Sequence, residues 1–193
     1  AARARLNAEA PRDRAGVPVY RVSLDDFIIK ALGLALQRLP DANVTYSDSG
    51  LLRHRRSDVG FAVAVPGGHY TPVVRGVEAM PLSRLAAEVR DLAERARARK
   101  LAPAECQGGT TAVSNLGMHG IEEFTAIINP PQATILAVGA ASRRPAVVGD
   151  SLAVRTQMTC TLSCDHRAVD GAVAAELLGT FRALIEDPTL MLA

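Results

Sequence analysis

A chain of 193 residues, 48% of them hydrophobic, can bury one sizeable core, and we expect a single domain over residues 1–193. A net charge of +2 and an aromatic content of 4% provide neither a basic stripe nor stacking platforms, so no nucleic acid partner is expected. No apolar run reaches the roughly 18–20 residues that cross a bilayer, and the charged first residues are unlike a signal peptide. We therefore expect no membrane partner and an intracellular location.

The first strong pattern is an amphipathic helix over residues 23–39, where apolar side chains recur at three- and four-residue spacing. Ser23 followed by Asp26 is typical of a capping box at the helix start. Pro40 cannot continue a helix and is expected to end it.

Segments rich in Val, Thr and Ile follow this helix and alternate with two more helical patterns. The predicted strands cover residues 59–65, 71–77, 110–115, 133–140, 144–148 and 152–163, and the further helices cover residues 83–99 and 171–186. Pro66-Gly67-Gly68 and Gly149-Asp150-Ser151 are predicted turns, and Asp187-Pro188 ends the last helix. Helices and strands in mixed order with antiparallel hairpins indicate an α+β fold.

Three cysteines form no metal-binding pattern. Cys160, Cys164 and His166 are close in sequence, but structural zinc sites use paired Cys-x₂₋₄-Cys motifs, and only the distant Cys106 remains as a fourth ligand. We therefore favour buried reduced thiols over a zinc site and expect no metal.

The chemistry-bearing stretch lies between the last predicted strand and the last helix. Asp165, His166 and Arg167 follow an apolar segment, and Asp170 and Gly171 precede the helix. A neutral imidazole with a pKa near 6.5 can accept the proton of a thiol at neutral pH. An alternative stays open for Asp170, which could simply cap the helix.

This stretch, DHRAVDG, resembles the HxxxDG signature of CoA-dependent acyltransferases. Its fuller form, SCDHRAVDGA, is similar to the catalytic domain of the dihydrolipoamide acyltransferases of 2-oxo acid dehydrogenase complexes. The resemblance continues, in the family's order, through VSLDDFIIKALGLAL, VGFAVAVPGG, TPVVRGV and QGGTTAVSNLGMHGIEEFTAIINPPQATILAVGA, and it spans the chain from about residue 5 to its end. The SNLG to AVG portion resembles the acetyl-transferring members of pyruvate dehydrogenase complexes more than the succinyl- or branched-chain-transferring ones.

The resemblance implies a mechanism and a set of site residues. His166 matches the general base that takes the proton from the thiol of coenzyme A, and Ser114 matches the hydroxyl donor to the oxyanion. Asp170 completes this set, and the family's aspartate pairs with an arginine to hold the active-site loop. Arg167, Asp165 and Asn115 are expected to support the site. A strand-end hydroxyl that bonds its own turn is the alternative for Ser114.

Other candidate groups are expected to be structural. His54, His69 and His119 lie outside the motif and are interpreted as surface residues. The Asn129–Gln132 stretch is expected to form a turn rather than to take part in catalysis.

The resemblance also implies an assembly. The family fold is a sandwich shared with chloramphenicol acetyltransferase, and it works as a trimer with His166 and Ser114 of different subunits in one site. Such trimers build octahedral or icosahedral cores with decarboxylase and dihydrolipoamide dehydrogenase partners, and the apolar 189–193 tail is expected to serve as an anchor. The expected location is the bacterial cytoplasm or the mitochondrial matrix.

Parts of the family's usual chain are not recognised here. We expect that the N-terminal strand, the lipoyl domain and the peripheral-subunit-binding domain are missing from residues 1–193, so the lipoyl group would arrive on another domain. Two alternative functions stay open, a non-catalytic core-building paralogue and a stand-alone CoA-dependent acyltransferase with a small acceptor.

Overall fold

A mixed sheet of five strands forms the centre of the fold in the computed structural model, which describes residues 2–191. Its strands are β3 (Val59–Phe61), β6 (Val73–Val74), β7 (Thr111–Asn115), β8 (Thr134–Val138) and β11 (Cys160–Cys164). They lie in the order β11-β8-β7-β3-β6, with β3, β7 and β8 parallel and the two edge strands antiparallel to their neighbours. This arrangement is an α+β fold.

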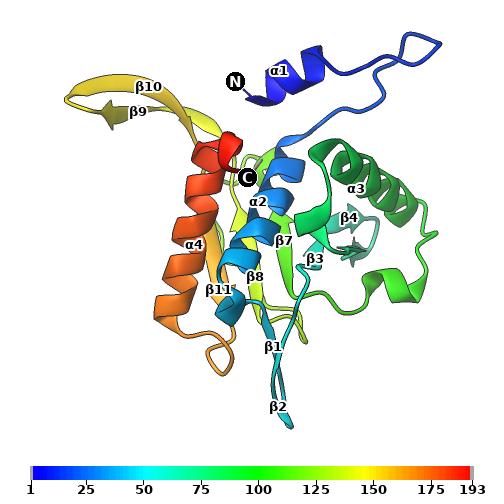
Figure 1. The fold of residues 1–193 in the computed structure, drawn as a ribbon, viewed down its shortest axis with the longest axis vertical. Helices are drawn as coiled ribbons and strands as arrows, with labels where there is room; N and C mark the ends of the chain where they lie inside the picture. The colour runs from blue at the N-terminus through cyan, green and yellow to red at the C-terminus, as the bar shows by residue number, and fades with distance from the viewer. Residues whose placement is uncertain (1, 192–193) are drawn as a thin grey trace.

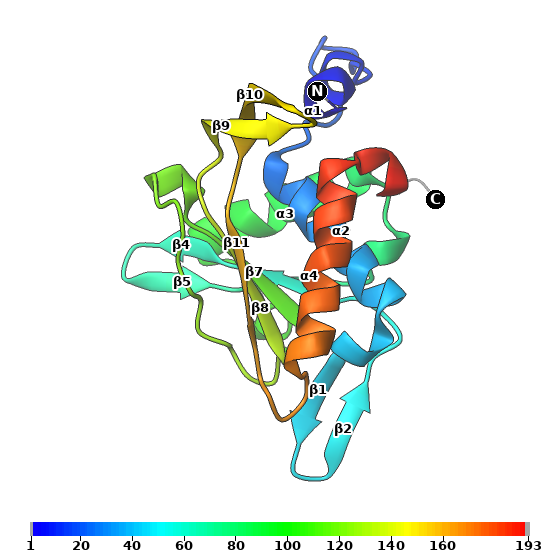
Figure 2. The same cartoon turned by 90° about the vertical axis from the view of Figure 1, so that its left-hand side faces the viewer.

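Three long helices pack on one face of this sheet (Figures 1 and 2). They are α2 (Leu24–Arg38), α3 (Leu82–Arg97) and α4 (Gly171–Glu186), and a short helix α1 (Ala2–Ala8) precedes them. Val113 and Leu136 point into the core against the helices. Because side chains alternate along a strand, their neighbours Ser114 and Ala137 point to the opposite face.

Helix α2 starts and ends where the sequence predicts. The Ser23 hydroxyl accepts a hydrogen bond from the Asp26 amide at 3.2 Å, and the Asp26 carboxylate accepts one from the Ser23 amide at 2.6 Å, so the capping box is confirmed. The buried Lys30 donates from Nζ to the carbonyls of Val77, Glu78 and Met80 at 2.8 to 3.1 Å. These bonds fasten α2 to the short 3₁₀ turn at Val77–Ala79, and burial lowers the pKa of Lys30.

Three two-stranded ribbons project from the central layers. They are β1 (Val44–Ser47) with β2 (Gly50–Arg53), β4 (Val63–Val65) with β5 (Gly68–Tyr70), and β9 (Ser142–Val148) with β10 (Ser151–Gln157). The two predicted turns are confirmed, since Gly67 and Gly149 adopt positive φ angles of 85° and 57° between paired strands.

The predicted strands at 59–65 and 71–77 are wrong in extent. The first divides at Ala62 into β3, which joins the main sheet, and β4, which pairs with β5. The second shrinks to β6, because Pro72 has no amide to donate and Gly76 turns the chain with φ 61°.

The predicted strand at 152–163 also divides. β10 pairs only with β9, whereas β11 joins β8, and the break falls at Met158 and Thr159. An alternating pattern cannot show this break, because a strand may change partners without changing its own periodicity.

Short 3₁₀ segments connect several of these elements. They lie at Pro40–Ala42, Val77–Ala79, Pro103–Cys106, Gly117–His119 and Pro188–Met191. In the last of them Met191 is 6% exposed and joins the main core, while Leu190 is 39% exposed. Met191 therefore packs against its own chain, the anchor role of the 189–193 tail stays a prediction, and Leu192 and Ala193 lie outside the described residues. Within residues 2–191, no helix combines the length and apolar character that a bilayer crossing requires.

Candidate active site

The turn after β11 presents His166 to solvent from a fixed backbone. The Asp165 amide donates to the Ala133 carbonyl at 2.8 Å, and the Asp165 carbonyl accepts from the amides of Ala168 and Val169 at 2.9 Å. Val169 is 1% exposed and packs in a small cluster with Val44 and Ala133. The buried Val169 side chain and these backbone hydrogen bonds therefore hold the turn, while His166 stays exposed.

Asp165 and Arg167, the residues directly before and after His166, form an ion pair. The Asp165 carboxylate accepts hydrogen bonds from Arg167 Nε at 3.0 Å, from Nη2 at 2.8 Å and from the Arg167 amide at 3.1 Å. The guanidinium lowers the pKa of Asp165 and the carboxylate raises that of Arg167, mainly through these side-chain bonds. Both groups therefore keep their charge at neutral pH.

Asp170 caps helix α4. Its Oδ1 accepts from the amides of Ala172 at 2.8 Å and Val173 at 2.9 Å, which satisfies two of the free donors at the helix start. The expected pairing of this aspartate with an arginine is wrong for the arginine of the motif, because Arg167 bonds Asp165 instead. Asp170 thus supports the turn through the helix that follows it.

Ser114 lies near the end of β7, on the sheet face away from the helices. The next residue, Asn115, points to the helical side, where its Nδ2 donates to the Asp25 carboxylate of α2 and its Oδ1 accepts from the Gly117 amide at 2.8 Å. Asn115 therefore fixes both the end of β7 and the turn that follows Ser114. No pattern in the sequence marks Asp25, apart from its place beside the capping box.

Ser114 and His166 of one chain do not meet. Ser114 is level with Thr161 of β11, whereas His166 follows Cys164, which is level with the first residue of β7. Three residues along a strand cover about 10 Å, and β8 lies between the two strands, which adds about 10 Å. A hydroxyl and an imidazole that act on one thioester must lie far closer than this.

The Asn129–Gln132 segment forms the predicted turn. The Gln132 amide donates to the Asn129 carbonyl at 3.1 Å, and the Pro130-Pro131 peptide is cis. Gln132 is 3% exposed and forms an isolated bridge with Thr45, so this turn joins β1 to the start of β8.

The other histidines and the cysteines differ in exposure. His69 and His119 are exposed as expected, but His54 is half-buried and its Nε2 lies 3.1 Å from the Thr45 hydroxyl. Burial lowers the pKa of His54, so its assignment to the surface is wrong. All three cysteines are free and partly buried, and burial raises the pKa of Cys160 to about 11. A thiol with this pKa is a poor nucleophile at neutral pH.

The whole chain matches one protein family. The profile of the catalytic domain of 2-oxoacid dehydrogenase acyltransferases aligns with residues 1–193. The chain belongs to this acyltransferase family. The acetyltransferase component of the pyruvate dehydrogenase complex from Rhizobium meliloti (strain 1021) is 53% identical over 192 residues. That alignment covers 100% of this acyltransferase chain but 43% of the relative, so the chain spans less than half of that protein.

Solved structures of the family have the same fold. The cubic core of the pyruvate dehydrogenase multienzyme complex and the dihydrolipoamide acetyltransferase of Azotobacter vinelandii each superpose with a TM-score of 0.90 at 36% identity. Both alignments cover 99% of this acyltransferase domain and 77% of the other chain. The Azotobacter study addresses a serine, a histidine and an asparagine in the catalytic mechanism, with the histidine 52 residues after the serine and the asparagine four residues later.

A more distant structure shows the fold alone. Chloramphenicol acetyltransferase is 15% identical, with a TM-score of 0.56 over 95% of this acyltransferase domain and 82% of the other chain. The predicted sandwich fold is thereby confirmed.

Proposed function

We propose that this chain is the catalytic domain of a dihydrolipoamide acetyltransferase that transfers acetyl between dihydrolipoamide and coenzyme A. The observation that carries the proposal is the position of His166, exposed on a rigid turn within a chain that matches the family over its full length. The intervals from Ser114 to His166 and from His166 to Asp170 equal those between the serine, histidine and asparagine of the Azotobacter enzyme. Asp170 replaces that asparagine, and both side chains carry the oxygen that caps a helix.

The reaction follows from the chemistry of these groups. The His166 imidazole removes the proton from the coenzyme A thiol, and the thiolate attacks the carbonyl carbon of the acetyl thioester on dihydrolipoamide. The Ser114 hydroxyl donates a hydrogen bond to the negative oxygen of the tetrahedral intermediate, which is worth roughly 3 kcal/mol in such sites. The carbon–sulfur bond to dihydrolipoamide then breaks, and the leaving thiolate takes the proton back from His166. One thioester is exchanged for another, with no net change in protonation.

A complete site requires a second copy of the chain. Because Ser114 and His166 of one chain lie more than about 10 Å apart, a neighbouring subunit must bring its serine to the histidine. We propose the trimer of the family as this assembly. Exposed apolar side chains on the β9–β10 ribbon, among them Val147 at 74% and Leu152 at 80%, support burial of this ribbon between subunits.

The wider assembly is proposed on the same basis. Trimers would join into an octahedral or icosahedral core that holds the decarboxylase and dihydrolipoamide dehydrogenase subunits. The lipoyl group would come from a domain outside residues 1–193, since this catalytic domain spans 43% of its Rhizobium relative. We propose the bacterial cytoplasm or the mitochondrial matrix as the location of this assembly.

Acetyl transfer from acetyl-CoA to dihydrolipoamide by the purified oligomer tests the proposal. We expect His166→Ala to lose at least the roughly hundredfold that a general base contributes. The exposed His69→Ala serves as the matched control and should retain parental activity. An intact oligomer that transfers nothing would indicate a core-building subunit, and transfer to free alcohols or amines instead would indicate a stand-alone acyltransferase.

A further inference from the structure

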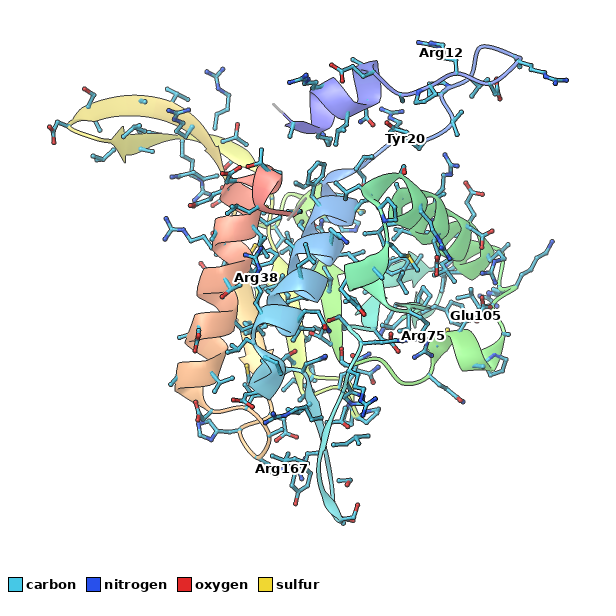
Figure 3. The ribbon with its side chains drawn as sticks, viewed as in Figure 1. Arg12, Tyr20, Arg38, Arg75, Glu105 and Arg167 are labelled. Carbon is cyan, nitrogen blue, oxygen red and sulfur yellow. The ribbon has the colours of Figure 1, made fainter. Side chains whose placement is uncertain are left out.

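The β1–β2 ribbon touches the His166 turn through one aromatic side chain. The guanidinium carbon of Arg167 lies 4.1 Å from the ring centroid of Tyr46, which is a cation–π distance. Figure 3 shows Arg167 beside this ribbon, at the end of the molecule where β11 passes into α4. Tyr46 and Arg167 are far apart in the sequence, so only the fold brings them together.

Arg167 is held on two sides. Asp165 binds its Nε and Nη2 in a two-pronged contact, while the Tyr46 ring covers its face. A planar guanidinium accepts both contacts at once because its hydrogen bonds lie in the plane and its π contact lies above it. The Arg167 side chain is 64% exposed and would otherwise be free to change rotamer.

The base of the ribbon is fixed to the same turn. Val44 packs with Val169 and Ala133, and Thr45 forms a bridge with Gln132. Tyr46 therefore extends from a rooted segment, and its ring provides a fixed surface for Arg167. No residue within 2–191 hydrogen-bonds to the Tyr46 hydroxyl, so the ring rather than the hydroxyl makes the contact.

We infer that Tyr46 is a positioning residue for His166, and this inference rests on the proposed function. His166 lies between Asp165 and Arg167, and the clamp formed by these two residues and Tyr46 fixes the backbone on either side of the imidazole. Loss of the ring leaves Arg167 held by Asp165 alone, and this looser clamp widens the range of directions in which the imidazole points. Transfer then slows because the base is misplaced in a larger share of encounters, while substrate binding is unchanged.

Three variants in the purified, mass-checked oligomer test this role. Tyr46→Leu removes the π face, Tyr46→Phe keeps it, and Leu52→Ala changes an exposed side chain on the same ribbon. We expect kcat to fall about threefold to tenfold in Tyr46→Leu, as for a cation–π contact at a partly exposed site, with KM for both substrates within about twofold. Tyr46→Phe and Leu52→Ala should retain parental kcat.

A double-mutant cycle with Arg167→Met keeps the test decisive if Tyr46→Leu weakens the oligomer. In the Arg167→Met background, Tyr46→Leu should cause no further loss of kcat, because the side chain through which it acts is gone. Additive losses, an equal loss in Tyr46→Phe, or parental kcat in Tyr46→Leu would each overturn the inference. Failure of the proposed function is separate, since the parent itself would then not transfer acetyl to dihydrolipoamide.

Discussion

The two ends of the central sheet hold their functional groups in different ways. At the His166 end, a short turn is closed by its own hydrogen bonds, by Asp165 and Arg167, and by a helix cap. At the Ser114 end, one side chain from α2 holds the strand end through Asn115. Each end is rigid, yet strand register keeps them apart. Under the proposed function the chain carries two half-sites, and acetyl transfer then depends on the assembly of at least two chains.

The sharpest way to test this separation is complementation between two inactive chains. Ser114→Ala and His166→Ala should each lose about a hundredfold or more alone, through the oxyanion donor and the base. Co-expressed trimers that mix at random should recover about a quarter of parental activity, because one subunit supplies histidine and its neighbour supplies serine. Acetyl transfer per site in the mixed oligomer measures this. No recovery in verified mixed trimers would place both groups of a site in one chain.

The position of Ser114 can be loosened by removing the hydrogen bonds of the adjacent Asn115. Asn115→Ala leaves the Gly117 amide and the Asp25 carboxylate without partners, so we expect roughly 1–3 kcal/mol lower free energy of unfolding. The kcat should fall about tenfold as the hydroxyl loses its fixed place. Asp25→Asn keeps an acceptor oxygen and is the control. Parental kcat in Asn115→Ala, measured with urea unfolding on the same sample, would remove Asn115 from the site.

Substitutions of Asp170, which caps helix α4, distinguish a structural role of this residue from a chemical one. Asp170→Ala should lower the free energy of unfolding by about 1 kcal/mol, and Asp170→Asn by only a few tenths, because the amide oxygen still caps α4. Thermal melting at matched protein concentration measures this, with the exposed Asp150→Ala as control. A large loss of kcat in Asp170→Asn without a loss of stability would show that the charge itself acts in catalysis.

The smallest expected effect is the loss of stability at low pH that follows from the Asp165–Arg167 ion pair. Arg167 lowers the pKa of Asp165 below its ordinary value of 3.8. The stabilisation from this pair is therefore fully present well above pH 3.8 and is lost as the pH falls through the lowered pKa. The melting-temperature difference between the parent and Asp165→Asn should therefore stay constant from neutral pH to about pH 5 and shrink below about pH 4. A difference that disappears near pH 6 would contradict this assignment.

The sequence by itself determined the three long helices and the two glycine turns, but not the short helix α1, and it indicated the ionisable groups of the His166 stretch. Helix periodicity, the Ser23–Asp26 cap and the stops at Pro40 and Pro188 act within a few residues, so they are readable in the chain. The resemblance of DHRAVDG to a known signature indicated the base and its family. Only the tertiary structure decided that the strands divide at Ala62 and near Met158, because pairing partners leave no mark on the periodicity of a strand.

Tertiary structure also decided which charges pair and which groups meet. Arg167 pairs with Asp165, whereas Oδ1 of Asp170 accepts from the first amides of helix α4. Tyr46 contacts Arg167 beside His166, and Asp25 contacts Asn115 beside Ser114. Each contact comes from a segment distant in the sequence, and no spacing in the sequence predicts it. The separation of Ser114 from His166 is a matter of register in three adjacent strands, which depends on pairing across the whole fold.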